Sequence, residues 1–395
     1  MAGKPTSLAV IALAQVLALS TWFAGAAALP ALHAASDLSP GAAAALSSAV
    51  QLGFVAGAVV SATFNLPDRF DARRVFAAGA GASALASLIA LVMEPGSAAM
   101  IITRFLTGAA LALVYPVGMK LAASWAKGDA GLLVGLLVGA LTLGSAAPHL
   151  AAPFFETAGW RAPFAGSALA ASMAAGLIFA ARAGPAFKAA PRFRPGAAFK
   201  ALRRKDLLLI NAGYLGHMWE LYAMWAWTGA FIAAWRAARG LEAEAGVFTF
   251  AVVAIGAAGA LGAGWIADRK GRAVTAGVAL ALGGACALLT PWAWAGPGWL
   301  LGLVLLIYGT VVIADSAQFS AALAERAPAD LAGSLLTLQT ASGFALTVVS
   351  VQLAPLWAEA MGWRYSFVPL AIGPVIGVAA MIAYHRIETA PNKGT

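Results

Sequence analysis

The stretch Asp206–Trp235, DLLLINAGYLGHMWELYAMWAWTGAFIAAW, is long enough and apolar enough to cross a membrane as one helix. A span needs about 20 apolar residues. Near the middle of this stretch, His217 and Glu220 are three residues apart, so they lie on one side of the helix. A carboxyl group at the centre of a bilayer costs about 2.5–3.5 kcal/mol to insert. We therefore expect the pair to face a polar cavity inside a helical bundle; the alternative is an ordinary interhelical hydrogen bond.

The whole chain has the composition of a polytopic membrane protein. Of its 395 residues, 62% are hydrophobic and 10% are charged, whereas soluble domains contain about 25% charged residues. The single cysteine, Cys286, allows no intrachain disulfide and no cysteine-based metal site. No phosphate-binding glycine pattern or nucleophile elbow stands out in the sequence. We therefore expect no cofactor, no metal site and no enzymatic activity.

Apolar runs predict an all-α membrane protein with twelve transmembrane helices in two six-helix bundles. Many runs are rich in Ala and Gly, which lets helices approach closely. The basic stretch 182–205 is the one long linker, and it separates an N-terminal bundle, 1–181, from a C-terminal bundle, 206–395. The predicted spans are 8–32, 43–66, 74–93, 99–124, 131–154, 162–181, 206–234, 246–267, 273–291, 299–324, 331–354 and 365–385.

The distribution of Lys and Arg predicts the orientation of the chain. With a cytoplasmic N-terminus, 19 of the 25 basic residues fall in cytoplasmic segments and 4 in outer loops, and Arg104 and Lys120 lie within a span. Cytoplasmic loops carry such an excess of positive charge, so both termini are expected in the cytoplasm. This topology also accounts for the net charge of +9 without a nucleic-acid partner.

Three sequence markers recur in the two halves at nearly constant spacing. Asp68-Arg69 recurs as Asp268-Arg269, 200 residues later, and Asp129 recurs as Asp330 after 201. Gly159-Trp160-Arg161 recurs as Gly362-Trp363-Arg364 after 203. Two repeats of six helices imply pseudo-symmetric halves with a binding site between them near the middle of the membrane.

The segment Gly264–Arg272, GWIADRKGR, matches the GxxxDRxGR loop motif of the major facilitator superfamily, which the chain resembles over its whole length. The first-half copy, Asp68–Arg74, keeps the acid and the basic cluster but has lost the glycines. Arg104-Phe105-Leu106-Thr107-Gly108 is similar to the RxxxG motif of that superfamily. The resemblance implies an alternating-access transporter, and its general character is similar to bacterial cyanate and nitrate/nitrite permeases.

The loop motif also has a physical interpretation as a latch. A carboxylate at the cytoplasmic end of a helix binds backbone N–H groups of a neighbouring helix end and pairs with an arginine. Such a contact favours one side of the transporter opening over the other; the alternative is a loop that only sets topology and solubility. The expected latch residues are Asp68, Arg69, Gly264, Asp268, Arg269, Gly271 and Arg272.

Ionisable residues within the spans differ in sign between the halves. The first half has Arg104, Lys120 and His149, and the second half has His217, Glu220 and Asp315. Arginine and lysine suit a carboxylate or oxyanion, and buried carboxyl and imidazole groups exchange protons. Arg104 could instead serve packing or coupling, Lys120 could extend to the interface, and His149 could be a packing contact. The expected substrate-binding residues are Arg104, Lys120, Tyr115, Trp22, Tyr214, His217 and Gln339, and the expected proton-coupling residues are Glu220, Asp315 and His217.

These features predict a secondary active transporter that moves a small anion across the bacterial inner membrane, coupled to protons or another ion. It is expected to act as a monomer in contact with membrane lipid. One alternative is a proton-driven exporter of cationic or amphipathic compounds, with Glu220 and Asp315 as counter-ions and aromatic rings as a cation–π surface. A sensor that uses the fold without net transport is the third hypothesis.

Overall fold

The computed structural model describes residues 3–150, 159–187, 192–242 and 245–389. In this part of the chain, helices lie over all twelve predicted spans and no strand is present, which confirms the all-α fold class. Residues 151–154 of the fifth predicted span lie outside the described residues. Ten spans are long and apolar enough to cross a membrane by length and composition. The helices Ala72–Ala90 and Lys205–Ala237 are not among the ten, and polar residues such as Arg73 and Glu220 lower their mean hydropathy.

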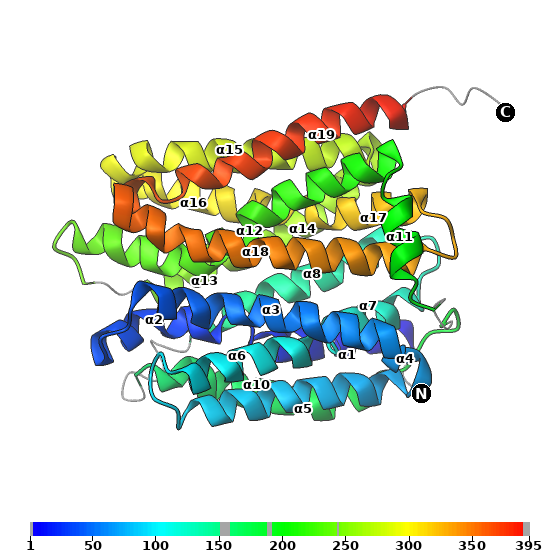
Figure 1. The fold of residues 1–395 in the computed structure, drawn as a ribbon, viewed down its shortest axis with the longest axis horizontal. Helices are drawn as coiled ribbons and strands as arrows, with labels where there is room; N and C mark the ends of the chain where they lie inside the picture. Colours follow the sequence, from blue (N-terminus) through cyan, green and yellow to red (C-terminus); the bar gives the residue numbers. More distant parts are fainter. Residues whose placement is uncertain (1–2, 151–158, 188–191, 243–244, 390–395) are drawn as a thin grey trace.

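The first half of the chain forms the lower layer of helices in Figure 1. Several predicted spans consist of two consecutive helical segments rather than one. The segments are α1 (Lys4–Leu19), α2 (Ala24–Ala35), α3 (Pro40–Phe64), α4 (Leu66–Arg69), α5 (Ala72–Ala90), α6 (Ala98–Leu111), α7 (Tyr115–Ala123), α8 (Ala130–Ala146), η1 (Ala147–Leu150), α10 (Arg161–Leu177) and η3 (Ile178–Ala180).

The second half forms the upper layer and follows the short linker helix α11 (Pro195–Ala201). Its helices run roughly parallel to those of the first half. They are α12 (Lys205–Ala237), α13 (Gly246–Ala254), α14 (Gly256–Lys270), α15 (Arg272–Ala295), α16 (Gly298–Val311), α17 (Ser316–Arg326), α18 (Ala332–Met361), η4 (Trp363–Tyr365), η5 (Val368–Ala371) and α19 (Ile372–Glu388).

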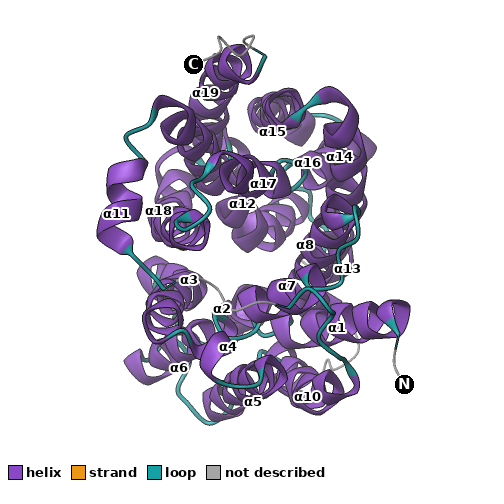
Figure 2. Ribbon diagram, turned by 90° about the vertical axis from the view of Figure 1, so that its right-hand side faces the viewer, coloured by secondary structure: helices purple, strands orange, loops and turns teal. Residues whose placement is uncertain are grey.

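Contacts between several helices join the halves. Helix α3 packs along α18, and α8 packs along α13 and α14, so α8 lies between the two layers in the end-on view of Figure 2. Helix α1 begins and α19 ends at the same end of the bundle (Figure 1), as expected if both termini lie on one side of the membrane. The domain boundaries 1–181, 182–205 and 206–395 stay a proposed division.

Four predicted spans are each divided into two α-helices by a short break. The first span breaks at 20–23, the fourth at 112–114, the eighth at Ile255 and the tenth at 312–315. Broken membrane helices leave backbone groups that a buried protein environment must satisfy. The fourth and tenth breaks are 200 residues apart, so Tyr115 and Asp315 occupy equivalent places beside the second segments α7 and α17.

The repeated Gly-Trp-Arg marker performs the same structural task in each half. Gly159 and Gly362 have φ of +53° and +80°, a left-handed conformation that favours glycine. The following arginines then reach the end of a neighbouring helix. Arg161 Nε donates to the Leu91 carbonyl after α5, and Arg364 Nε donates to the Pro291 carbonyl in α15, each at 3.0 Å. The acceptors are also 200 residues apart, so the sequence repeat is a repeated tertiary contact.

We expect Arg364→Ala to lower the free energy of unfolding by about 1–2 kcal/mol, because a charge-assisted hydrogen bond to a carbonyl is lost. Arg161→Ala should cost less, since its hydrogen bond is exposed whereas that of Arg364 is partly buried. Thermal unfolding in detergent measures both effects. Arg69→Ala is the matched control, because this exposed arginine makes no side-chain hydrogen bond with a described residue. Equal melting temperatures for all three variants would contradict the assignment.

Candidate functional site

A cluster of aromatic side chains fills the middle of the contact between the halves. Trp22, at the α1–α2 break, lies 5.0 Å from Phe54 and 5.3 Å from Phe344 between ring centroids. The Phe344 ring centroid also lies 5.0 Å from that of Tyr222 and 4.6 Å from that of Phe54. These residues come from α3, α12 and α18 as well as the α1–α2 break, and all four are buried. The cluster closes the centre of the molecule.

One cavity lies on each side of this cluster along α3 and α18. The cavity at the predicted outer end has a volume of about 520 Å³ and is lined from α2, α3, α12 and α18. The cavity at the predicted inner end has about 420 Å³ and is lined by residues that include Asn65, Asp68, Lys120, Thr337 and Thr340. The arrangement therefore has two cavities separated by a closed central layer.

Polar groups without partners gather in this central layer. Both amide atoms of Gln339 are buried and have no hydrogen-bond partner among the described residues, and the same is true of Gln15 Oε1 and Trp22 Nε1. Gln15 Nε2 makes a long contact of 3.4 Å to the Tyr115 carbonyl. Buried polar groups are nearly always satisfied, so these unpaired amide atoms are candidates for contact with a polar ligand.

Tyrosine hydroxyls add to this neutral polar surface. Tyr115 comes from the first half and Tyr214 and Tyr222 from the second, and the three lie close enough to interact electrostatically. The Tyr214 hydroxyl also lies close to the Thr340 side chain. Hydroxyl and amide groups both donate and accept hydrogen bonds. The layer therefore suits a solute with several hydroxyl or amide groups.

The second half holds a buried pair of ionisable groups between α12 and the start of α17. His217 Nδ1 lies 2.8 Å from Asp315 Oδ1, and both side chains are almost fully inaccessible. The approach is close but poorly aligned for a hydrogen bond. The rings of Tyr214 and Phe319 flank the imidazole at 6.1 and 5.9 Å. The helix break at 312–315 brings Asp315 to the histidine.

Glu220 lies one turn after His217 on α12 and is 1% exposed. Its carboxyl group lies within reach of Tyr308 from α16, and its Oε1 has no hydrogen-bond partner in the described part of the chain. A Cβ atom on Gly283 of α15 would lie 2.9 Å from Oε2. Gly283 therefore leaves the space that the carboxyl group occupies. No described residue forms an ion pair with Glu220.

Arg104 is fully buried and satisfies the break in the first span. Its Nη2 donates to the carbonyls of Thr21 and Trp22, both at 2.7 Å. These oxygens follow the end of α1, where a helix presents negative partial charge. The Nε atom has no hydrogen-bond partner among the described residues. It lies close to Gly25: a Cβ atom added to that glycine would be 3.3 Å from Nε. The arginine thus binds backbone carbonyls, as the packing alternative for this residue expects.

Lys120 lies at the predicted inner end, where it forms an ion pair with Asp68 and approaches the Phe187 ring at 5.0 Å. The pair lines the inner cavity. In the adjacent loop, a side-chain hydrogen bond from Arg73 holds the pKa of Asp71 below its usual range. Asp68 and Lys120 thus connect the first-half loop motif to α7.

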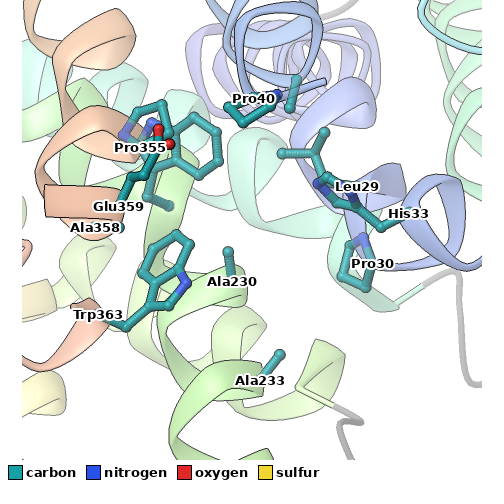
Figure 3. Close-up of a pocket in the computed structure, with 12 residues that line it drawn as sticks. Leu29, Pro30, His33, Pro40, Ala230, Ala233, Pro355, Ala358, Glu359 and Trp363 are labelled. Carbon is teal, nitrogen blue, oxygen red and sulfur yellow. The ribbon is translucent and has the colours of Figure 1, made fainter. Parts of the chain in front are cut away.

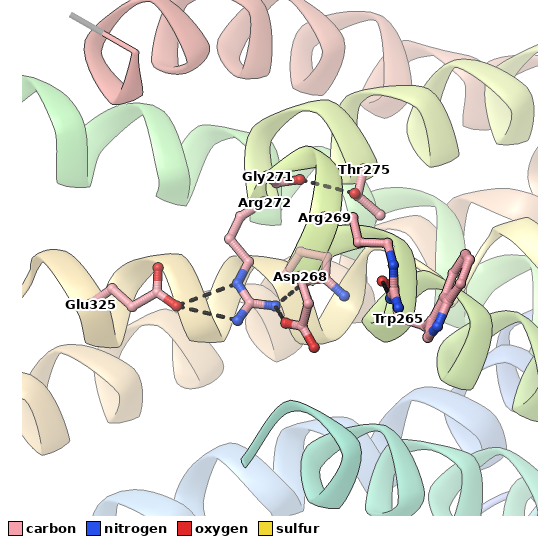
Figure 4. Close-up of polar contacts among 8 residues, drawn as sticks. Trp265, Asp268, Arg269, Gly271, Arg272, Thr275 and Glu325 are labelled. Carbon is pink, nitrogen blue, oxygen red and sulfur yellow. Dashed lines mark hydrogen bonds and ion pairs between the residues drawn. The ribbon is translucent and has the colours of Figure 1, made fainter. Parts of the chain in front are cut away.

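The second-half loop motif forms a connected set of polar contacts, shown in Figure 4. Arg272 Nη1 lies 3.5 Å from Asp268, and Arg272 Nη2 lies 3.3 Å from Glu325 of α17. Arg272 also donates to Gln318 Oε1 at 3.0 Å. Arg269 stacks 3.8 Å above the Trp265 ring, while its Nη1 bonds the Trp265 carbonyl.

Two glycines of this motif have clear geometric roles. Gly271 has φ of +88°, which allows the tight turn from α14 to α15. Gly264 lies near α8: a Cβ atom added to Gly264 would be 3.8 Å from the carbonyl oxygen of Gly131. Both Asp268 carboxylate oxygens lie 3.4 Å from the site of a Cβ on Gly131, in the first turn of α8. Asp268 therefore stands beside the N-terminus of a helix from the other half, as the latch interpretation requires.

The structure brings some predicted site residues together and separates others. His217, Asp315 and Glu220 lie in one buried region of the second half, and Trp22, Tyr115, Tyr214 and Gln339 lie at the contact between the halves. Arg104 and Lys120 lie apart from both groups. The prediction omitted Gln15, Tyr222, Tyr308, Gly283 and Gln318. Gln15 and Gln318 carried a usable signal, since amides within apolar runs are rare, whereas Gly283 carried none.

Two packed sets of membrane helices, a polar layer at their contact and a cavity on each side define a multi-pass secondary transporter. The sequence profile of the Major Facilitator Superfamily matches residues 11–351, and the chain belongs to this superfamily. Members of the family are transporters rather than enzymes. No curated protein matches the chain.

Solved structures of transporters share the fold across almost the whole chain. The xylose transporter XylE from E. coli, in a partially occluded inward-open conformation, matches with a TM-score of 0.73 and 14% identity over 98% of each chain. A D-xylose-proton symporter matches at 0.71 and 17% identity over 95% of this chain and 96% of its own. The nucleoside transporter NupG matches at 0.70 and 14% identity over 97% of this chain and 100% of its own.

We expect Gly283→Ala to displace the Glu220 carboxyl group and to change the pH dependence of transport. Gly277→Ala on the same helix is the control, because its added Cβ makes an ordinary contact of 3.4 Å with Met381. Alanine is favoured over glycine in a helix by about 1 kcal/mol, so the control should gain stability while Gly283→Ala gains less or loses. Thermal unfolding and pH–transport profiles test this. Indistinguishable profiles would contradict the close approach of Glu220 and Gly283.

Proposed function

We propose that the chain is a proton-coupled transporter of a small polar organic solute, with a neutral, hydroxyl- or amide-rich solute as the preferred class. The observation that carries this proposal is the group of buried, unpaired amide atoms of Gln15 and Gln339 beside Tyr115, Tyr214 and Tyr222. These groups come from both halves. A solute that hydrogen-bonds to both at once stabilises the closed arrangement, in which its own polar groups are also satisfied.

Alternating access would then follow from the two cavities. The aromatic cluster around Trp22 and Phe344 closes the centre while the outer and inner cavities remain on either side. Rocking of one half against the other opens one cavity toward the solute site and closes the other. The ion pair of Lys120 and Asp68 lies at the inner cavity, and Asp268 beside α8 joins the halves at the same end. The Asp268 contact, which joins the two halves, would hold the inner end closed, while the Lys120–Asp68 pair fixes the first-half loop against α7.

Glu220 is the proposed proton carrier, with the His217–Asp315 pair as its neighbour. A carboxyl group that is 1% exposed and has no cationic partner among the described residues is costly to leave charged. Opening to water on one side would let it release a proton, and closure would favour proton binding. Because Tyr308 of α16 and Gly283 of α15 lie next to the carboxyl group, its environment depends on how α12, α15 and α16 pack.

Helix α17 offers a route from this proton site to the latch. Asp315 stands at its start beside His217, Gln318 binds Arg272 one turn later, and Glu325 binds Arg272 near its end. Arg272 in turn faces Asp268, which lies beside α8 of the other half. A change in charge at His217 and Asp315 would shift α17 and so strengthen or weaken the contact between the halves.

A small anion is the second candidate substrate. The observation that favours it is Arg104, a buried arginine whose Nε is unpaired and whose contacts include no carboxylate among the described residues. We rank it second because two hydrogen bonds already bind its Nη2 to the carbonyls of Thr21 and Trp22. Lys120, the other cation expected for an anion site, is paired with Asp68.

We further propose that the protein lies in a bacterial inner membrane, with both termini in the cytoplasm, and that it works as a monomer. The orientation rests on the excess of basic residues in alternate loops, above all in the linker 182–205. The membrane location rests on the apolar spans.

The function is tested first by a thermal-shift screen of purified protein with polyols, pentoses and nucleosides, small carboxylates, and organic cations. A ligand of the folded state raises the melting temperature. We expect a neutral solute to stabilise the wild type, and Gln339→Leu to abolish that shift while retaining the fold. Stabilisation by a carboxylate alone, lost in Arg104→Lys but kept in Gln339→Leu, would instead select the anion hypothesis.

The stabilising solute is then followed into proteoliposomes. Glu220→Gln should abolish accumulation driven by a proton gradient yet retain solute counterflow, which needs no net proton movement. Normal gradient-driven accumulation in Glu220→Gln would refute the proton-carrier role.

We expect Gln318→Leu to weaken the link between pH and conformation, because it removes the Arg272 contact in the middle of α17. A fluorescent label at the inner end should report opening across a pH series in the wild type and a much smaller response in the variant. Ser320→Ala is the control on the same helix, since its hydroxyl makes no hydrogen bond with a described residue. Equal responses in wild type and Gln318→Leu would show that the signal does not pass through this contact.

A further inference from the structure

The outer cavity is chemically unlike the central layer. It encloses about 520 Å³, and most of its lining residues are Ala, Leu, Pro and Trp. Figure 3 shows Leu29, Pro30 and His33 on one wall and Glu359 and Trp363 on the other. Its size and apolar walls are those of a small-molecule site. None of the central polar residues lines it, and the aromatic cluster separates the two.

Only two ionisable side chains of the described residues, one carboxyl group and one imidazole, line this cavity. They belong to Glu359 and His33. Glu359 forms no ion pair with a described residue, so its carboxylate is available to a ligand. Trp227 and Trp363 lie 6.1 Å apart between ring centroids and line the same cavity. A carboxylate beside indole rings is the combination that recognises an organic ammonium ion.

We propose that the outer cavity binds an organic cation with an apolar or aromatic body. The positive head would lie between the Glu359 carboxylate and the Trp363 ring, and the body would pack against Leu29, Pro30 and Ala230. An anion would meet Glu359 and be repelled. A neutral apolar molecule would fill the same walls but leave the carboxylate without a partner.

This site goes beyond the proposed solute function and does not depend on it. Its walls come from both halves, with α2 and α3 from the first and α12 and α18 from the second. An occupant would keep these helices apart, and outer closure would need its release. The cation is therefore expected to slow solute exchange without competing for the central amides.

The test is calorimetric titration of the purified full chain with benzyltrimethylammonium and with its uncharged isostere, neopentylbenzene. Glu359→Gln should weaken binding of the cation roughly tenfold, because the variant loses the attraction between the carboxylate and the positive head. The same variant should leave the isostere within about twofold of wild type. Trp363→Leu should weaken binding of the cation more than binding of the isostere. Glu94→Gln is the control, because this exposed outer-loop carboxylate does not line the cavity.

Three results would overturn the proposal: no binding of the cation, equal binding of cation and isostere with no effect of Glu359→Gln, or loss of cation binding in Glu220→Gln alone. The last result would place the cation at the central carboxyl group. Melting temperatures of all variants confirm that each is folded. Since neither ligand carries the hydroxyl or amide groups of the proposed solute, failure here leaves the thermal-shift and proton-gradient tests of Gln339 and Glu220 unaffected, and success does not establish them.

Discussion

One constraint shapes the second half of the protein: a carboxyl group sits deep within the membrane-spanning bundle without a positively charged partner among the described residues. Glu220 is 1% exposed and meets Tyr308 and the space left by Gly283. Insertion of such a group into a bilayer costs about 2.5–3.5 kcal/mol, and packing must hold it away from lipid. The helices that surround it, α12, α15 and α16, therefore enclose a carboxyl group that is shielded from lipid.

The two halves share a framework but differ in their chemistry. The Gly-Trp-Arg repeat makes the same carbonyl contact in each half, through Arg161 and Arg364. The equivalent helix breaks, by contrast, carry different residues: Tyr115 in the first half and Asp315 in the second. The loop motifs differ too. Asp68 pairs directly with Lys120, whereas Arg272 bridges Asp268 to Glu325. The repeat thus preserves the packing contacts, while the residues at equivalent helix breaks differ in chemistry; our proposal assigns solute binding to the contact between the halves and proton transfer to the second half.

Much of the fold could be predicted from the sequence because the membrane limits the possibilities. Apolar runs gave the places of the twelve spans, and the spacing of Asp68 and Asp268 gave the repeat. The helix breaks at 20–23 and 312–315 were not predictable, since neither stretch contains proline or glycine and the carbonyls freed at the first break are satisfied by a distant residue, Arg104.

The candidate site was less predictable for the same reason. Ionisable residues within spans stand out in a sequence, so His217, Glu220 and Asp315 could be singled out, and the structure places the three in one buried region of the second half. Whether an arginine is free to bind a solute depends on tertiary contacts, and Arg104 is held by the carbonyls of Thr21 and Trp22. Gly283 matters because it lacks a side chain where the Glu220 carboxyl group lies. The sequence does not distinguish this glycine from the other glycines among the 43 in the chain.

The most direct test of the account is an infrared difference spectrum of purified protein between mildly acidic and mildly alkaline conditions. If Glu220 exchanges a proton within the bundle, the wild type should show the carbonyl stretch of a titrating carboxylic acid in an apolar environment. That band should be absent from Glu220→Gln and shifted in Gly283→Ala. Identical difference spectra for wild type and Glu220→Gln would show that Glu220 keeps one charge state throughout, and proton coupling would then need another group.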